Sequence, residues 1–185
     1  MPDRPGRCIR HLHVTELNAM SGMEIERKFL VKKDAPFREQ AFSHSHLRQG
    51  YIPAKGITLR IRKQDDTGFI TIKGPSTDGG LSRYEFEKTI SAEESEQLMH
   101  FCESPVIVKT RYRVKHAGHV FEIDEFHADN QGLILAEVEL RNADEEFEKP
   151  DYIGMEVTGD GRFYNSHLRA NPFSRWKHSL PEEYR

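Results

Sequence analysis

The chain has 185 residues, a formal net charge of −3 and a hydrophobic content of only 36%. This length suits one domain, and the slight negative charge argues against a nucleic-acid-binding protein with a broad basic surface. No stretch is long and apolar enough to span a membrane or to form a secretory signal, so we expect a cytoplasmic protein with no membrane partner.

Residues 1–22 show neither helical nor strand periodicity. Met20 and Met23 both stand just before the first predicted strand. We therefore expect residues 1–22 to be either a disordered extension or a sequence ahead of the true start of translation. Neither Cys8 nor Cys102 has zinc-ligand spacing, and two cysteines indicate no disulfide framework.

Eight segments alternate charged with mostly apolar residues, which is the period of a β-strand. Short, turn-rich links at 64–68 and 116–118 predict hairpins, and residues 74–80 predict a mobile loop at the mouth of a barrel. The predicted strands are 24–31, 47–52, 58–63, 69–73, 83–90, 106–115, 119–126 and 133–141.

Three short helices are predicted outside these strands. Ser91 with Glu94 forms a capping box ahead of an apolar stripe. A second helix is expected to start at Asn142. Asp160 is expected to cap a third, which ends before the Asn-Pro pair at 171–172 because the residue before a proline disfavours the helical region.

The charges on the strands come in groups of one sign. In one interpretation these faces are simply solvated, as in an ordinary antiparallel sheet. In the other, acids and bases converge on a shared cation and a polyanion, which explains the repetition across six strands. The acids are Glu24, Glu26, Glu85, Glu87, Glu122, Asp124, Glu137 and Glu139, and the bases include Lys28, Arg60, Arg62, Lys109, Arg111 and Arg113.

Such a charged face cannot form a dry core, because each buried ion costs several kcal/mol beyond what imperfect pairing returns. A closed sheet of about eight strands leaves room inside for side chains or one small ligand, and closure removes exposed strand edges. We therefore predict a mainly β protein of the α+β class. Its core is an eight-stranded antiparallel closed barrel with a charged, hydrated lumen, accompanied by a few short helices.

The order of the charged motifs resembles the CYTH superfamily, the triphosphate tunnel metalloenzymes. Residues 24–28 fit the family's Glu-x-Glu-x-Lys motif, and the remaining charged strands follow in the family's order. The resemblance is greatest to the short, stand-alone bacterial members. It covers residues 23–172, which we expect to form the tunnel domain, with 173–185 as a C-terminal tail. The later motifs are at 58–62, 71–74, 83–87, 109–112, 122–124 and 137–139.

The resemblance implies a tunnel that binds a linear triphosphate and hydrolyses its phosphoanhydride bond with Mg²⁺ or Mn²⁺. Divalent cations of this kind prefer oxygen ligands, and guanidinium groups match phosphate oxygens. The implied catalytic residues are Glu24, Glu26 and Lys28, and the implied metal ligands are Glu24, Glu26, Glu137 and Glu139. The implied substrate-binding residues are Arg60, Arg62, Lys73, Arg83, Lys109, Arg111 and Arg113.

The role of five further acids stays open at this stage. Glu85, Glu87, Glu122 and Asp124 lie on the charged face, where they either bind metal or orient the tunnel bases through ion pairs. Glu156 resembles a late family acid that closes the tunnel, and the alternative is the exposed end of a surface strand.

The expected function is an inorganic triphosphatase that converts tripolyphosphate to pyrophosphate and phosphate. A class IV adenylyl cyclase or a thiamine triphosphatase uses the same tunnel, but no aromatic cluster clearly supplies a ring-binding surface, and Trp176 lies past the strands. Stacking of Tyr51, Tyr84 or Tyr112 on such a ring stays open as the alternative. A non-enzymatic polyphosphate-binding module is disfavoured because Glu24 and Glu26 are intact. The expected partner is a small-molecule triphosphate, and a homodimer is compatible with the sequence.

Overall fold

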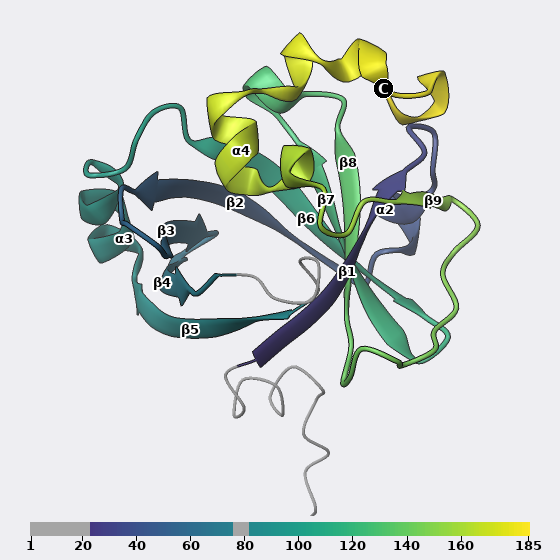
Figure 1. Ribbon diagram of the computed structural model, residues 1–185, viewed down its shortest axis with the longest axis horizontal. Helices are drawn as coiled ribbons and strands as arrows, with labels where there is room; N and C mark the ends of the chain where they lie inside the picture. Colours follow the sequence, from purple (N-terminus) through teal and green to yellow (C-terminus); the bar gives the residue numbers. More distant parts are fainter. Residues whose placement is uncertain (1–22, 76–81) are drawn as a thin grey trace, which may run out of the picture.

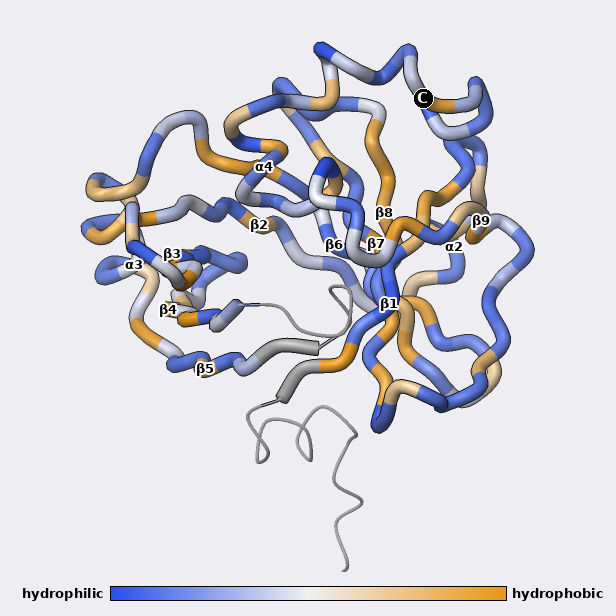
Figure 2. The backbone as a smooth tube through the Cα atoms, viewed as in Figure 1, coloured by the Kyte–Doolittle hydropathy of each residue, from blue (hydrophilic) through white to orange (hydrophobic). Residues whose placement is uncertain are grey.

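The computed structural model describes residues 23–75 and 82–185. The alternating segments form nine strands, and hydrophilic and hydrophobic residues follow one another along them (Figures 1 and 2). The strands are β1 (Met23–Val31), β2 (Ser43–Ile52), β3 (Thr58–Gln64), β4 (Thr67–Lys73), β5 (Ser82–Ser91), β6 (Ile107–His116), β7 (His119–Phe126), β8 (Ile134–Glu139) and β9 (Ile153–Glu156).

The strands form one antiparallel sheet in the order β5-β4-β3-β2-β6-β7-β8-β1-β9. The predicted hairpins are confirmed: β3 pairs with β4, and β6 pairs with β7. β5 also pairs with the start of β1, where Met23, Glu24 and Ile25 lie opposite Tyr84, Arg83 and Ser82. All eight predicted strands are present, and β9 is an addition that the sequence analysis missed.

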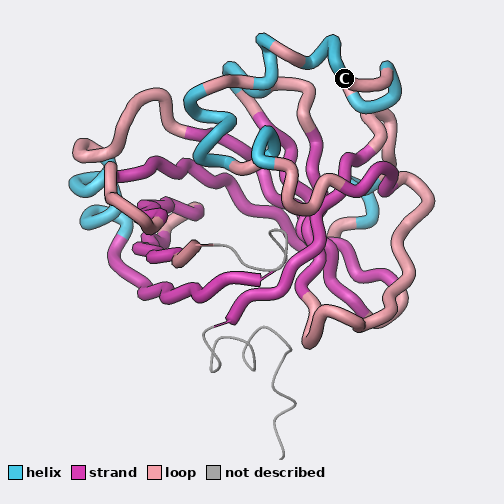
Figure 3. Tube along the Cα trace, in the orientation of Figure 1, coloured by secondary structure: helices cyan, strands magenta, loops and turns pink. Residues whose placement is uncertain are grey.

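The helices are short and lie at the periphery of the sheet (Figure 3). The predicted capping box is confirmed at the start of α3 (Ala92–Met99): the Glu94 amide donates to Ser91 Oγ at 3.0 Å, and the Ser91 amide donates to Glu94 Oε2 at 2.7 Å. α3 packs on β3, β4 and β5. It approaches β4 so closely that a Cβ atom at Gly68 would lie 2.7 Å from Ser95 Cβ.

The other helix predictions are corrected by the structure. No helix starts at Asn142, because its Oδ1 accepts a hydrogen bond from the Asp144 amide and stabilises a turn instead. The predicted helix after Asp160 is interrupted at Tyr164, whose extended backbone separates η3 (Gly161–Phe163) from α4 (Asn165–Ala170). The elements that were not predicted are α2 (Phe37–Gln40), η2 (Ala128–Asn130), η4 (Phe173–Arg175), η5 (Lys177–Ser179) and η6 (Glu182–Tyr184).

Two apolar clusters flank the charged part of the sheet. The first contains Phe37 of α2 and residues from one face of β1, β6, β7 and β8. The second joins four strand residues to the C-terminal segment, which packs against the sheet through Phe173, Leu180 and Tyr184 (yellow in Figure 1). Its strand residues are Leu30, Ile107, Phe126 and Leu135.

These four strand residues have the same strand parity as the predicted charged face. The face therefore changes from charged to apolar along β1, β6, β7 and β8, and the second cluster forms an apolar floor below the charges. No helix within residues 23–75 and 82–185 is long and apolar enough to cross a membrane.

Candidate functional site

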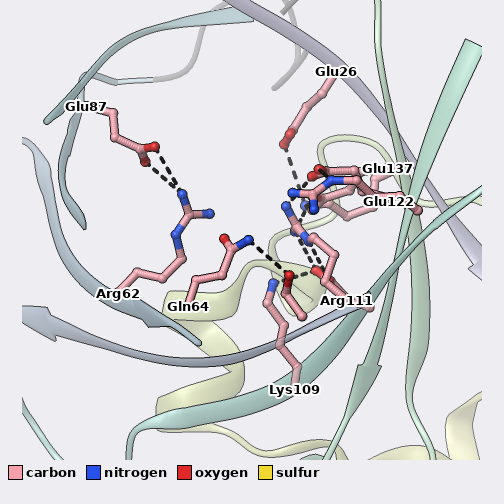
Figure 4. Close-up of polar contacts among 12 residues, drawn as sticks. Glu26, Arg62, Gln64, Glu87, Lys109, Arg111, Glu122 and Glu137 are labelled. Atoms are coloured by element: carbon pink, nitrogen blue, oxygen red, sulfur yellow. Dashed lines mark hydrogen bonds and ion pairs between the residues drawn. The ribbon is translucent and has the colours of Figure 1, made fainter. Parts of the chain in front are cut away.

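The charged faces surround a cavity of about 770 Å³. Residues of the eight strands β1 to β8 line it, and Figure 4 shows two groups of side chains: Arg62 and Glu87 on one side, and Arg111, Glu122 and Glu137 on the other. The predicted site residues that line the cavity are Glu26, Lys28, Arg60, Arg62, Lys73, Glu85, Glu87, Arg111, Arg113, Glu122, Glu137 and Glu139.

Two arginines of β3 share one carboxylate of β5. Arg62 Nη2 donates to both oxygens of Glu87, at 3.0 and 3.1 Å, and Arg60 Nη2 donates to Glu87 Oε2 at 3.2 Å. Thr71 Oγ1 donates to the same oxygen at 2.7 Å. The Nε atoms of both arginines are buried and make no hydrogen bond within the described residues. These two donors therefore have capacity for an anionic ligand.

The same wall carries a second acid and a third base. Glu85 forms an ion pair with Lys73, and Arg60 Nη2 lies 3.6 Å from Glu85 Oε1. Burial and the neighbouring Arg60 lower the pKa of Arg62 to about 10, although Glu87 opposes that shift. Despite its own burial, Glu87 has a lowered pKa because Arg62 and Arg60 stabilise the carboxylate. This wall therefore holds more positive charge than its acids neutralise.

Arg111 of β6 is surrounded by three carboxylates. Its Nε and Nη2 donate to the two oxygens of Asp124, at 2.6 and 2.7 Å, and Nη2 also donates to Glu137 Oε2 at 3.1 Å. Nη1 donates to Glu122, which in turn accepts from Arg113 Nε at 2.9 Å. Despite burial, Asp124 and Glu122 raise the pKa of Arg111 well above its ordinary value. The guanidinium is thus held by hydrogen bonds from Nε, Nη1 and Nη2 to three carboxylates.

Asp124 is the buried member of this network, and Lys109 lies next to it below the cavity surface. Their side chains are 2% and 1% exposed, they pair with each other, and neither lines the cavity. Burial lowers the pKa of Lys109 to about 8, against the attraction of Asp124. Phe126 of the apolar floor lies 5.4 Å from the ammonium. The Lys109 side chain thus lies one layer below the cavity surface. Its role in substrate binding stays a prediction.

Acids of the neighbouring strands β1 and β8 lie next to each other in the sheet. Glu26 lies opposite Glu139, and Lys28 lies opposite Glu137. Lys28 Nζ is 2.7 Å from Glu137 Oε1 and 3.6 Å from Glu26 Oε1. Despite burial, Lys28 and Arg111 hold the pKa of Glu137 well below its ordinary value. Facing carboxylates supply the oxygen ligands that hard divalent cations prefer, so this place suits a divalent ion.

Three predicted site residues lie outside this description of the cavity. Glu156 contacts Arg27 instead, with Arg27 Nε donating to Glu156 Oε1 at 2.8 Å, and both residues line a different groove, about 870 Å³ in volume. The backbones of Glu24 and Arg83 lie opposite each other in neighbouring strands. Their side chains lie outside the described part of the chain.

The cavity also contains residues that the sequence analysis did not select. Lys115 continues the i, i+2 series of bases on β6 and lines the cavity, so strand parity was a sufficient signal for it. Tyr51 lines it too, and its hydroxyl accepts a hydrogen bond from the buried Gln49 amide at 2.8 Å. Tyr164 and Asn165, at the start of α4, come from a segment with no strand alternation and no sequence signal of a site.

The chain is similar to several proteins that are named inorganic triphosphatase. It is 44% identical over 158 residues to an inorganic triphosphatase of Acetivibrio thermocellus, covering 84% of this chain and 99% of that protein. It is 41% identical over 150 residues to an inorganic triphosphatase of Nitrosomonas europaea, covering 78% and 95%. A crystal structure of an inorganic triphosphatase matches with a TM-score of 0.55 and 35% identity, over 79% of this chain and 93% of that one. The model of the CYTH domain matches residues 22–164, and the chain therefore belongs to the CYTH domain family.

Proposed function

We propose that this protein is an inorganic triphosphatase, which hydrolyses tripolyphosphate to pyrophosphate and phosphate inside the charged cavity. The observation that carries the proposal is one cavity in which bases of β3, β4 and β6 face acids of β1, β5, β7 and β8. The relatives at 44% and 41% identity support it, since both carry the name of this activity.

The cavity is proposed to be the lumen of an eight-stranded closed barrel. The continuous strand order from β5 to β1 supports closure, and so do the three residue pairs that join β5 to β1. In this arrangement β9 lies outside the ring of eight strands, along the end of β1. We assign residues 23–172 to this tunnel domain.

Glu26 and Glu139 are proposed to hold Mg²⁺ or Mn²⁺, with Glu24 and Glu137 as further ligands. Within the described residues, no three His, Cys, Asp or Glu side chains are grouped closely enough to form a metal site by themselves. Mg²⁺ is usually bound by one or two carboxylates together with substrate phosphates and water, so in this proposal the phosphates of the substrate complete the site. When bound, such an ion neutralises phosphate charge and activates the attacking water.

Arg60, Arg62 and Lys73 are proposed to bind phosphate oxygens from one wall, and Arg111 and Arg113 from the other. Phosphoryl transfer requires little covalent chemistry from the protein, so positioning and charge stabilisation carry the reaction. The fixed guanidinium groups suit this task, because preorganised donors need no rearrangement as charge develops. Lys28 Nζ lies 3.6 Å from Glu26 Oε1 and 2.7 Å from Glu137 Oε1, where its charge favours the ionised form of Glu137.

The direct test is phosphate release by the purified protein from tripolyphosphate with Mg²⁺ or Mn²⁺. We expect rapid release from tripolyphosphate and almost none from pyrophosphate, because the bases extend along the cavity beyond the reach of two phosphates. Faster formation of cyclic AMP from ATP than of phosphate from tripolyphosphate would instead identify a cyclase.

A substitution separates the metal ligands from the phosphate-binding bases. Glu26→Gln preserves the size of the side chain but removes the charge that the cation requires, so turnover should collapse and excess Mn²⁺ should restore only part of it. Calorimetric titration with Mn²⁺ should show weaker binding by this variant. The matched control is Glu39→Gln, an exposed site on α2. Near wild-type turnover of a folded Glu26→Gln protein would remove Glu26 from the metal site.

A further inference from the structure

The bases of β6 form a series of increasing exposure. Lys109 is buried next to the apolar floor, Arg111 is nearly buried, Arg113 is half-buried, and Lys115 is exposed. Arg111, Arg113 and Lys115 all line the cavity. Because Ile107 of the floor precedes this series, the outward end of β6, at Lys115, is the open mouth of the cavity on this wall.

Lys115 differs from the other bases of the cavity in its partners. Each of the other six lining bases whose side chains are described lies within 4.0 Å of a carboxylate. Lys115 makes no ion pair with any residue of the described ranges. Its Nζ instead lies 4.9 Å from the centre of the Phe42 ring, which is 54% exposed.

The net charge of the residues that line the cavity also distinguishes Lys115. Apart from Lys115, six bases and six carboxylates among the described lining residues cancel each other, so Lys115 supplies the net positive charge. It does so at the mouth, where water competes with ligands most strongly. A cation held over an aromatic face keeps its outward N–H donors available and loses less conformational freedom when it binds an anion.

We propose that Lys115, positioned by Phe42, is an anion subsite that binds the fourth phosphate of linear polyphosphates longer than tripolyphosphate. This inference rests on the proposed triphosphatase function. The step from Arg111 to Lys115 spans about 13 Å along the strand, which is longer than a linear triphosphate. With three phosphates among the paired bases, an added phosphate extends outward to Lys115, since the apolar floor closes the other direction along β6.

Lys115 therefore determines chain-length preference, and Phe42 is a positioning residue. The measured quantity is the ratio of kcat/KM for tetrapolyphosphate to kcat/KM for tripolyphosphate. Lys115→Gln should lower this ratio about three- to tenfold, the range for one partly exposed charged contact. Lys115→Arg should restore it. Phe42→Leu should lower the ratio by a smaller factor through KM, whereas Phe42→Trp keeps a ring below the ammonium and should preserve it.

Lys88→Gln is the matched control, because Lys88 is exposed on β5 and does not line the cavity. It removes the same charge and should leave the ratio unchanged. An unchanged ratio in Lys115→Gln would overturn the subsite. A loss of activity in Lys115→Gln with ATP alone, and not with tetrapolyphosphate, would also overturn it, because the mouth of the cavity would then bind a planar ring. A wild-type protein without tripolyphosphate hydrolysis would refute the proposed function separately, and calorimetric titration of tetrapolyphosphate into wild type and Lys115→Gln would still decide the subsite.

Discussion

The two walls of the cavity use the same residue types in different states. On the β6–β8 wall (Arg111, Glu122, Asp124 and Glu137), one guanidinium contacts three carboxylates, and Asp124 is 1% exposed. On the β3–β5 wall, Arg60 and Arg62 share the partly exposed Glu87 and each leaves a buried Nε–H without a partner among the described residues. The guanidinium of the first wall is held by three carboxylates, whereas the second wall keeps two N–H donors without a partner among the described residues.

The pKa shifts of the two arginines express this difference. The carboxylates around Arg111 outweigh burial and raise its pKa, whereas burial and Arg60 lower the pKa of Arg62 to about 10. A bound anion therefore interacts more favourably with the β3–β5 wall, because it supplies the negative charge that this wall lacks. On the β6–β8 wall the protein itself has already supplied that charge, so we expect its main contribution to be the fixed geometry of the site.

The largest expected effect is on the β6–β8 wall. Arg111→Met should lower the free energy of unfolding by about 3 to 5 kcal/mol, because it leaves buried carboxylates without their main counterion. Urea denaturation monitored by circular dichroism measures this loss, and activity should disappear with it. A loss below about 1 kcal/mol would show that water already reaches these acids, and the contrast between the walls would disappear.

A smaller and different effect is expected on the β3–β5 wall. Arg62→Gln should raise KM for tripolyphosphate about tenfold or more, the value of a lost charge-assisted contact. Stability should change little, because Glu87 keeps Arg60 and Thr71 as partners. Steady-state kinetics and urea denaturation on the same preparation test both statements. Equal destabilisation by Arg62→Gln and Arg111→Met would contradict the division into two kinds of wall.

Strand parity predicted most of the lining of both walls. The alternation at Arg60 and Arg62, at Glu85 and Glu87, and along 109–113 requires only a period of two, and the structure places these faces inward, as a count along the strand predicts. The inward face of β2 has no charge pattern that would predict it, because it carries neutral residues such as Gln49.

The depth of each charge could not be predicted in the same way. Lys109 and Arg113 have the same parity, yet Lys109 is buried because the C-terminal segment closes the floor beneath it. That packing joins segments that are far apart in the sequence and leaves no local pattern. The missing helix at Asn142 has a similar origin, since a capping residue also stabilises a turn when no apolar stripe follows it.

Glu156 provides a reference ion pair outside both walls, and the smallest effect is expected there. Its side chain is 36% exposed and binds Arg27. Glu156→Gln should therefore lower the free energy of unfolding by no more than about 1 kcal/mol at neutral pH and leave tripolyphosphate hydrolysis unchanged.

The hydrogen bond from Arg27 holds the pKa of Glu156 below its ordinary value. This stabilisation is complete above the unfolded-state pKa, and it is lost as the pH falls through the folded-state pKa. The stability difference between wild type and variant should accordingly shrink below about pH 4.5. Urea denaturation at several pH values measures that difference, and a collapse of turnover in this variant would instead make Glu156 an acid of the active site.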